Sequence, residues 1–246
     1  MRLGLSSERI EGGVKQVKNV PERKRGRPRR GAEQNAEGLL EAAMETFAAN
    51  GFEQTSLRAI AATAGVDVAL ISYRYGSKMG LWQAIVTEVA RETVELLEAA
   101  IARAQDRPQA ERVDFISSEV VDVIWRRTHF SRIMFSEIIQ SRDEERKDFI
   151  EEALAKPFLE VVYPFVQSSL EAAGQKRPFD IKLGMMASIA LAGLLSSTRE
   201  FTGRFVEVAR HDEMLQYQVK QIIKSMWTGP ANNAVPTLQA AGTKGS

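Results

Sequence analysis

The side chains in this sequence that could do chemistry are suited to binding a polyanion rather than to catalysis. Residues 23–30 read RKRGRPRR, six basic residues in eight. Further along, residues 55–81 hold Arg58, Tyr73 and Lys78 within a pattern of short helices broken by glycine. Guanidinium, ammonium and hydroxyl groups donate hydrogen bonds to phosphate oxygens and base edges. We therefore expect a nucleic-acid contact at both stretches.

Catalytic chemistry has little support. Cysteine is absent and there are two histidines. His129 has no paired carboxylates at metal-ligand spacing, and no Ser/His/Asp order or glycine-rich phosphate loop stands out. We expect no enzyme activity, no cofactor and no metal. A helical enzyme that merely carries a DNA-binding domain is therefore disfavoured. The lack of cysteine fits a reducing cytoplasm, where we expect the protein. No run of about 18 apolar residues predicts a membrane span.

The charge is distributed unevenly. The chain has a net charge of +1, but residues 1–30 carry ten Lys/Arg and three Glu. Residues 1–32 have few large apolar side chains and are predicted to be a disordered basic arm. The segment 26–30, GRPRR, resembles an AT-hook, in which an extended Arg-Pro core lies in a narrow minor groove. Arg25, Arg27 and Arg29 are then DNA contacts; alternatively the run only attracts phosphates non-specifically.

Residues 33–80 are predicted to form a three-helix DNA-binding domain of the helix-turn-helix type. Apolar residues at helical spacing indicate a helix over 33–50, ended by Gly51. Thr55 is a candidate N-cap of the second helix, Asp67 of the third and Ser77 of the fourth. A short helix, a glycine-containing turn and a second short helix are typical of helix-turn-helix domains. The third helix, near 68–74, is the candidate recognition helix.

These residues resemble the N-terminal domain of the tetracycline-repressor (TetR) family. The resemblance covers about residues 35–85 and rests on GFEQTSLRAIAATAGV (51–66) and YRYGSKMGL (73–81). It implies phosphate contacts by Tyr73 and Lys78, and places Thr55 and Arg58 at the groove edge. Two positions depart from the family pattern: Asp67, where Ser or Asn is commoner, and Arg74, where an aromatic or His is common.

The recognition helix has side chains that suit a major groove. Val68, Ala69 and Leu70 are apolar and could meet thymine methyl groups, and Ser72 and Tyr73 offer hydroxyls. The head as a whole is acidic, with three basic residues against six acids in 33–80. Its binding must therefore rest on a few placed contacts, on helix N-termini and on the arm.

The remaining chain is predicted to be an all-α body over 81–228, followed by a disordered tail over 229–246. Helices are expected near 77–104, 109–127, 130–140, 143–173, 180–199 and 212–227. The first should bury Leu81, Ile85, Val89, Leu96 and Ala100. Pro157 and Pro164 should kink the fourth, and bent helices leave gaps for a ligand.

Aromatic and sulfur side chains gather in this body. In one interpretation they line an apolar ligand pocket; in the other they are plain core. The candidates for ligand binding are Trp125, His129, Phe130, Met134, Phe158 and Tyr163.

The last two helices are apolar enough to form a dimer interface, although they could instead close the monomer core. The small residues Gly184, Ala187, Ser188, Ala192 and Gly193 would permit close helix approach. The final helix presents Leu215, Val219, Ile222 and Met226. Because helix-turn-helix heads commonly bind paired half-sites, we expect a homodimer on palindromic double-stranded DNA.

The expected function is a transcriptional regulator, a repressor released from its operator by a small apolar or amphipathic effector. The alternative is an architectural or activating DNA-binding protein whose body binds a protein partner. A small molecule that binds and releases DNA would separate the two.

Overall fold

The computed structural model describes residues 30–228, with side chains from Gly38 onward, and this part of the chain contains helices and no strand. The predicted all-α class is confirmed. Arg25, Arg27, Arg29 and the tail lie outside the described residues. The elements are α1 (Arg30–Gln54), α2 (Leu57–Ala64), α3 (Val68–Tyr75), α4 (Lys78–Gln105), α5 (Gln109–Arg126), α6 (Thr128–Gln140), α7 (Glu144–Ile150), a π-helical turn (Glu151–Ala155), α8 (Lys156–Ala172), α9 (Ile181–Ser197), α10 (Arg199–Thr202), a 3-10 turn (Glu207–Arg210) and α11 (Asp212–Thr228).

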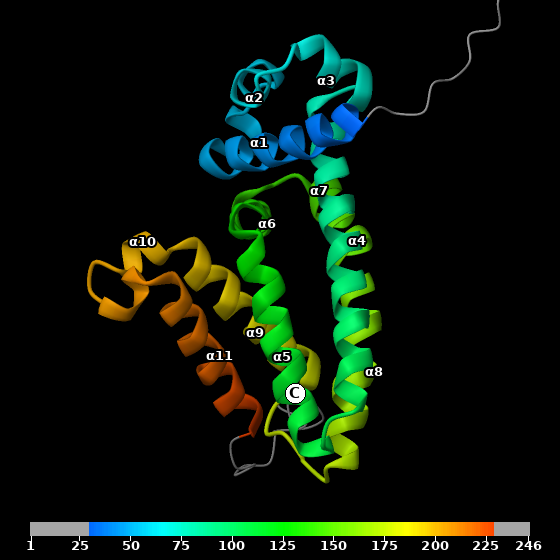
Figure 1. Ribbon diagram of the computed structural model, residues 1–246, viewed down its shortest axis with the longest axis vertical. Coiled ribbons are helices and arrows are strands. Elements are labelled where there is room, and N and C mark those ends of the chain that lie inside the picture. The colour runs from blue at the N-terminus through cyan, green and yellow to red at the C-terminus, as the bar shows by residue number, and fades with distance from the viewer. Residues whose placement is uncertain (1–29, 229–246) are drawn as a thin grey trace, which may run out of the picture.

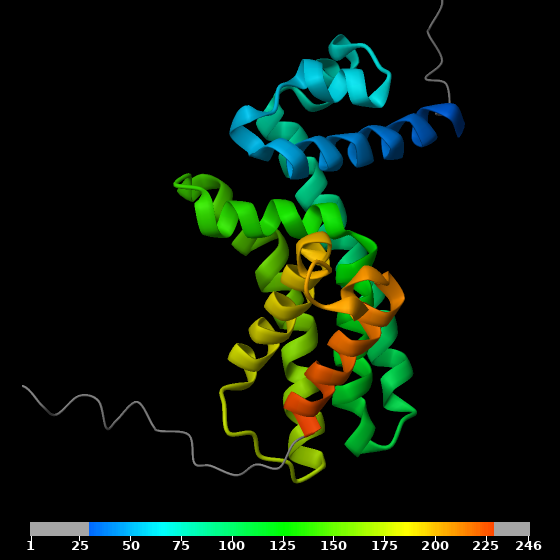
Figure 2. The same cartoon turned by 90° about the vertical axis from the view of Figure 1, so that its left-hand side faces the viewer.

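The helices form a head and an elongated body (Figure 1). Helices α1 to α3 make the head, and α4 runs from it along the length of the body beside α8. Helices α9, α10 and α11 cover one side of the body, as the rotated view confirms (Figure 2). Within the described residues, no helix is both long and apolar enough to cross a membrane.

Side-chain caps begin the short helices of the head. Asp67 accepts a hydrogen bond from Ala69 N at 2.7 Å, and Ser77 accepts one from Gly80 N at 3.0 Å, as predicted. The prediction for α2 was off by one residue, because Ser56 accepts from Ala59 N at 3.2 Å. Thr55 is buried and donates its hydroxyl to Gly51 O at 2.7 Å.

Gly51 interrupts the first helix where the sequence predicted its end, and a further helical turn follows the kink. Its φ of 73° lies in the left-handed region that favours glycine. Helical structure continues to Gln54, and the bend brings Phe52 back against Phe47, with ring centroids 5.7 Å apart. Phe52 also meets the edge of Trp82 on α4, so the end of α1 joins the core.

Two cores fill the molecule. One joins the head to the upper body and includes Phe47, Ile60, Trp82 and Phe130. The other fills the lower body between α4, α5, α8, α9 and α11. The predicted core stripe of α4 was wrong at one position, because Leu97 is fully buried and Leu96 is partly exposed. Leu96 and Leu97 point about 100° apart around the helix, and the packing of the body turns Leu97 inward.

The two prolines differ in effect: a π-helical turn precedes Pro157, whereas the helix continues through Pro164. Pro164 lies inside α8, and Pro157 lies in its first turn. Pro157 cannot donate a backbone hydrogen bond, so the turn before it widens and Lys156 N donates to Glu151 O, five residues back. Such π turns are frequent at functional sites.

The small residues of α9 mostly face the interior of their own chain. A Cβ placed on Gly193 would lie 2.3 Å from the Phe135 ring, and one on Gly184 would lie 2.5 Å from the Phe179 ring. Ser188 accepts a hydrogen bond from Trp227 Nε1 at 3.1 Å. The exposed side of α9 instead carries Leu183, Ala187, Ala190 and Leu194.

The final helix buries a slightly different set from the predicted one. Leu215 and Val219 are buried as expected, followed by Ile223 and Trp227. Ile222 is half exposed, because it lies about 100° around the helix from Ile223.

Candidate nucleic-acid interface and internal cavity

Helix α3 presents a surface that the body does not cover. Tyr73 is 92% exposed and Leu70 is 44% exposed, while Ile71 between them is fully buried. Ala69 and Ser72 are exposed and Val68 is half-buried. An exposed tyrosine beside an exposed leucine has no packing role in the isolated chain. Figure 1 places α3 at the end of the molecule away from the body, where a large partner could approach.

Tyr75, at the end of α3, is a packing residue rather than a contact. It is half-buried, and its burial raises the pKa of its phenol, an effect that the nearby charge of Arg74 partly opposes. The Arg74 guanidinium lies 5.6 Å from the centre of the Tyr75 ring. Arg58, on α2, is exposed.

Thr55 and Lys78 both have partners inside the head. The buried Thr55 hydroxyl is used within the fold, so a DNA contact by this side chain does not fit the structure. Lys78 Nζ donates to Phe52 O at 2.8 Å and to Glu53 O at 3.2 Å, and lies 4.4 Å from the centre of the Phe52 ring. Lys78 therefore stabilises the end of α1, and one of its three ammonium donors is left for another acceptor.

One acidic residue of α1 pairs with the body. Glu41 pairs with Arg127, where α5 meets α6, at 3.3 Å. Arg127 also pairs with Glu92 of α4 at 2.7 Å. One arginine of the body thus bridges the first helix of the head and the long helix that leaves it.

A buried arginine makes a second bridge between head and body. Arg146 of α7 is 4% exposed, and its Nε donates to Glu137 of α6 at 2.8 Å. The same guanidinium pairs with Asp143 at 2.8 Å and with Glu53 of the head at 2.9 Å, and lies 4.1 Å from the centre of the Phe52 ring. Burial disfavours the charged guanidinium, but hydrogen bonds and charges of Glu137, Glu53 and Asp143 outweigh it and raise the pKa of Arg146.

A cavity of about 210 Å³ lies where the two cores meet. Helices α4, α5, α6, α7, α8 and α9 and the π turn all contribute to its wall. Leu154 and Ala155 of that turn line it, so the distortion before Pro157 shapes the cavity. Its lining is apolar apart from Thr93, Arg127 and Ser131. The arrangement can hold a small apolar group.

Three of the six predicted ligand residues line this cavity and three do not. Phe130, Met134 and Phe158 form part of the wall. The others lie elsewhere. Trp125 Nε1 donates a hydrogen bond to Asp212 at 3.2 Å, and the centre of the Tyr163 ring lies 4.8 Å from Lys182 Nζ. His129 is next to Phe130 in the chain but does not line the cavity.

These three side chains point away from the cavity because neighbouring helical residues lie about 100° apart around the helix, and composition alone cannot say which of them faces inward. Arg127 was missed, because it is one of two adjacent arginines and nothing local in the sequence distinguishes it from Arg126.

A capped helix-turn-helix with an uncovered recognition helix, set on a helical body with an apolar cavity, is the architecture of a helix-turn-helix regulatory protein. Residues 39–85 match the family described as "Bacterial regulatory proteins, tetR family". A curated relative, the "Probable HTH-type transcriptional regulator YttP" of Bacillus subtilis (strain 168), is 28% identical over 100 residues, which are 41% of this chain. The chain spans about half of that relative, 48% of its length.

Solved structures share the fold over most of the chain. The transcriptional regulator FadR from Bacillus subtilis, in complex with stearoyl-CoA, has a TM-score of 0.59 at 19% identity, covering 78% of this chain and 98% of its own. The fatty acid degradation regulator FadR from Bacillus halodurans has a TM-score of 0.63 at 14% identity, covering 79% and 95%. An HlyIIR mutant protein has a TM-score of 0.60 at 22% identity, covering 80% and 99%.

The resemblance noted in the sequence is therefore confirmed. The chain has the N-terminal domain of the tetR family of bacterial regulatory proteins, and the all-helical fold of those regulators continues through its body.

Proposed function

We propose that this protein is a homodimeric, DNA-binding transcriptional regulator, a repressor that leaves its operator when a small apolar or amphipathic effector fills the cavity. The observation that carries the proposal is the uncovered face of α3, where Tyr73 and Leu70 are exposed on a helix fixed by the Asp67 cap. In this proposal Val68, Ala69, Leu70 and Ser72 meet base edges, whereas Tyr73, Arg58 and Lys78 contact the groove edge and phosphates.

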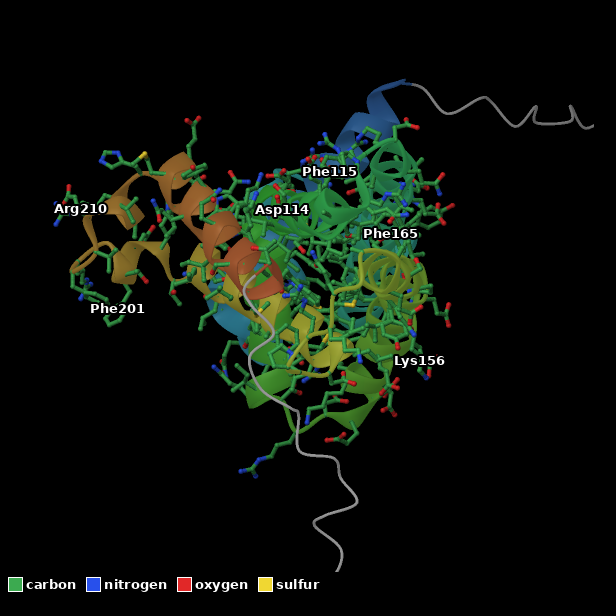
Figure 3. All side chains as sticks on the ribbon, turned by 90° about the horizontal axis from the view of Figure 1, so that it is seen from below. Asp114, Phe115, Lys156, Phe165, Phe201 and Arg210 are labelled. Atoms are coloured by element: carbon green, nitrogen blue, oxygen red, sulfur yellow. The ribbon has the colours of Figure 1, made fainter. Side chains whose placement is uncertain are left out.

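Dimerisation is supported by an exposed apolar surface on α9, α10 and α11. Figure 1 and Figure 2 show these helices together on one side of the body. Seen from below, Phe201 and Arg210 lie at the outer end of this layer, far from Lys156 and Phe165 (Figure 3). The exposed large side chains of the layer include Leu183, Leu194, Phe201, Phe205, Met214, Tyr217 and Ile222. Two copies that pack through this surface would bury it and present two α3 helices to successive major grooves, about 34–36 Å apart.

The basic arm completes the proposed interface. Because the head is acidic, we assign part of the attraction to DNA to residues 1–32, with Arg25, Arg27 and Arg29 as contacts. We keep residues 33–80 as the DNA-binding unit, 81–228 as the regulatory and dimerisation unit, and 229–246 as a tail. Removing residues 1–30 should weaken DNA binding and flatten its salt dependence.

The presence of the cavity favours a small molecule, rather than a protein, as the effector. The cavity is a partly open pocket whose wall includes the exposed Ile138 and Met186, and it joins a core that includes the head to a core that does not. A ligand that fits one arrangement of these cores better than the other shifts the population of head positions. One structure of similar fold is a FadR in complex with stearoyl-CoA, which contains a long acyl chain. A protein partner would instead require the outer surface that we assign to the dimer.

Selection of bound DNA from a random pool, using the full-length protein, tests the first part of the proposal. We expect a palindromic site with half-sites about one helical turn apart. Tyr73→Ala should bind that site about tenfold more weakly, because one phosphate contact is lost, while its melting temperature stays unchanged. If no sequence is enriched, or if Tyr73→Ala binds the selected site as tightly as the parent protein, the α3 interface is wrong. Competition of the selected DNA with apolar small molecules then tests release.

A further inference from the structure

We propose that the cavity takes an alkyl chain carrying one anionic group, and that the anion binds Arg127 in place of Glu41. Binding would then open an ion pair between the body and the head. This inference rests on the proposed effector function and gives the effector a chemical class and a point of action.

The lining of the cavity indicates both parts of the ligand. Among the described residues that form its wall, Arg127 is the one with a charge, and Thr93 and Ser131 are the other polar side chains. The apolar remainder suits a hydrocarbon chain. Burying a polar headgroup away from a partner is costly, whereas an anion beside a guanidinium is paired and hydrogen-bonded.

Arg127 lies where a headgroup would emerge. It lines the cavity and also lines a groove on the surface between α1 and α4. Val89 is the other residue common to both walls. A chain that fills the cavity from this side would therefore end at the guanidinium, with its headgroup facing the groove.

The two carboxylates that hold Arg127 are not equivalent. Glu92 lies 2.7 Å from Nη2 and its side chain is 34% exposed. Glu41 lies 3.3 Å from Nη1 and is 58% exposed, so it is the longer and better solvated pair. Exposed ion pairs contribute little, so Glu41 is the partner that is more easily displaced. An incoming anion would pair with Nη1 and displace Glu41.

The displaced partner, Glu41, is the one that links Arg127 to the head. Glu92 belongs to α4, which stays attached to the body, but Glu41 belongs to the first helix of the head. Loss of the Glu41 pair frees the head on this side and leaves the Arg146 bridge on the other. The effector would thus change the balance between two charged contacts that join the head to the body beside their shared core.

The surface groove next to the cavity suits a ligand of the opposite charge, a cation. Glu41, Glu88 and Glu92 line the groove, so a cationic amphipath could pair with these carboxylates. The cavity wall, however, offers a cation no carboxylate among the residues described. We therefore commit to the anion and make the cation an outcome of the experiment.

Calorimetric titration of the full-length protein with three probes of equal chain length tests the inference: decanoate, decanol and decyltrimethylammonium, each below its micelle concentration. We expect decanoate to bind about tenfold more tightly than decanol, as for a charge-assisted hydrogen bond. Glu41→Gln should tighten decanoate several-fold and leave decanol unchanged, because the competing carboxylate is gone. Glu95→Gln is the matched control, since Glu95 lies on α4 in an exposed pair with Arg91.

The outcomes separate this inference from the proposed function. If decanoate and decanol bind with equal affinity, or if decyltrimethylammonium binds more tightly than decanoate, the proposed anion site is wrong. Either result would still be consistent with an apolar effector cavity. A decanoate affinity unchanged by Glu41→Gln would overturn the displacement of Glu41. Failure of all three probes to bind would overturn the effector cavity itself, and this inference with it.

Discussion

Replacing Arg146 with methionine removes the cation that pairs with Glu137 inside the body. The Glu137 side chain is 6% exposed, so its carboxylate would stay buried without its guanidinium partner. Breaking a buried ion pair from one side costs about 3–5 kcal/mol in other proteins. The lost pairs with Glu53 and Asp143 add little, because both carboxylates are partly exposed. We expect a loss of about 3 kcal/mol in the free energy of unfolding.

Scanning calorimetry at one fixed protein concentration measures this loss. In a chain of this size each kcal/mol lowers Tm by about 2–4 °C, so Arg146→Met should lower Tm by about 6–12 °C. The double variant Glu137→Met/Arg146→Met should recover most of it, because no unpaired charge remains buried. Lys147→Met, next along the helix, is the control; Lys147 pairs with the exposed Glu144 and should cost about 0.5 kcal/mol at most.

Two results would refute this reasoning. One is an Arg146→Met variant as stable as the Lys147→Met control, which would mean that Glu137 is readily hydrated. The other is a double variant no more stable than the single one, which would assign the loss to packing against Phe52 rather than to charge.

The double variant also tests the coupling between head and body. It should keep the fold but lacks the contact to Glu53, so we expect effector binding to release DNA less strongly from this variant.

Three further predictions concern other surfaces. Tyr73→Ala should weaken operator binding about tenfold in a fluorescence titration, the loss of one hydrogen bond to phosphate, with Tm unchanged because the side chain is exposed. Leu194→Glu and Ile222→Glu, on the exposed faces of α9 and α11, should each give a monomer by sedimentation; a dimer retained in both would contradict the proposed interface. The raised pKa of Tyr75 means that the folded state holds this proton longer than the unfolded state, so stability should fall as pH rises above 10. Tyr75→Phe should remove that slope in alkaline denaturation, and an unchanged slope would place its cause elsewhere.

The head was largely predictable from local sequence. Asp67 and Ser77 begin their helices through hydrogen bonds to residues two or three positions away, and Gly65 and Gly76 adopt positive φ where the turns require it. Such features depend on neighbours in the chain, so their spacing is enough. The error at Thr55 was of the same local kind: two adjacent hydroxyls could cap α2, and burial of one of them decided in favour of Ser56.

The cavity was only half predictable. Pro157 pointed to a distortion of the helix, and the wider turn does line the cavity. The aromatic cluster indicated the region, but which of Trp125, His129 and Phe130 faces inward depends on how α5 and α6 rotate against their neighbours. That rotation is set by long-range packing, such as Phe135 against Gly193, and no local pattern contains it.

By itself, the sequence determined the all-helical class, the helix-turn-helix, its caps and the separation of a basic arm from an acidic body, because these follow from short-range spacing and charge. Only the tertiary structure decided the partners of the charged side chains. Arg127 and Arg146 are ordinary basic residues in the sequence, and each bridges head and body because folding brings Glu41 and Glu53 within ion-pair distance from more than 80 residues away. Such pairings depend on the relative placement of helices, which the cores of the molecule set.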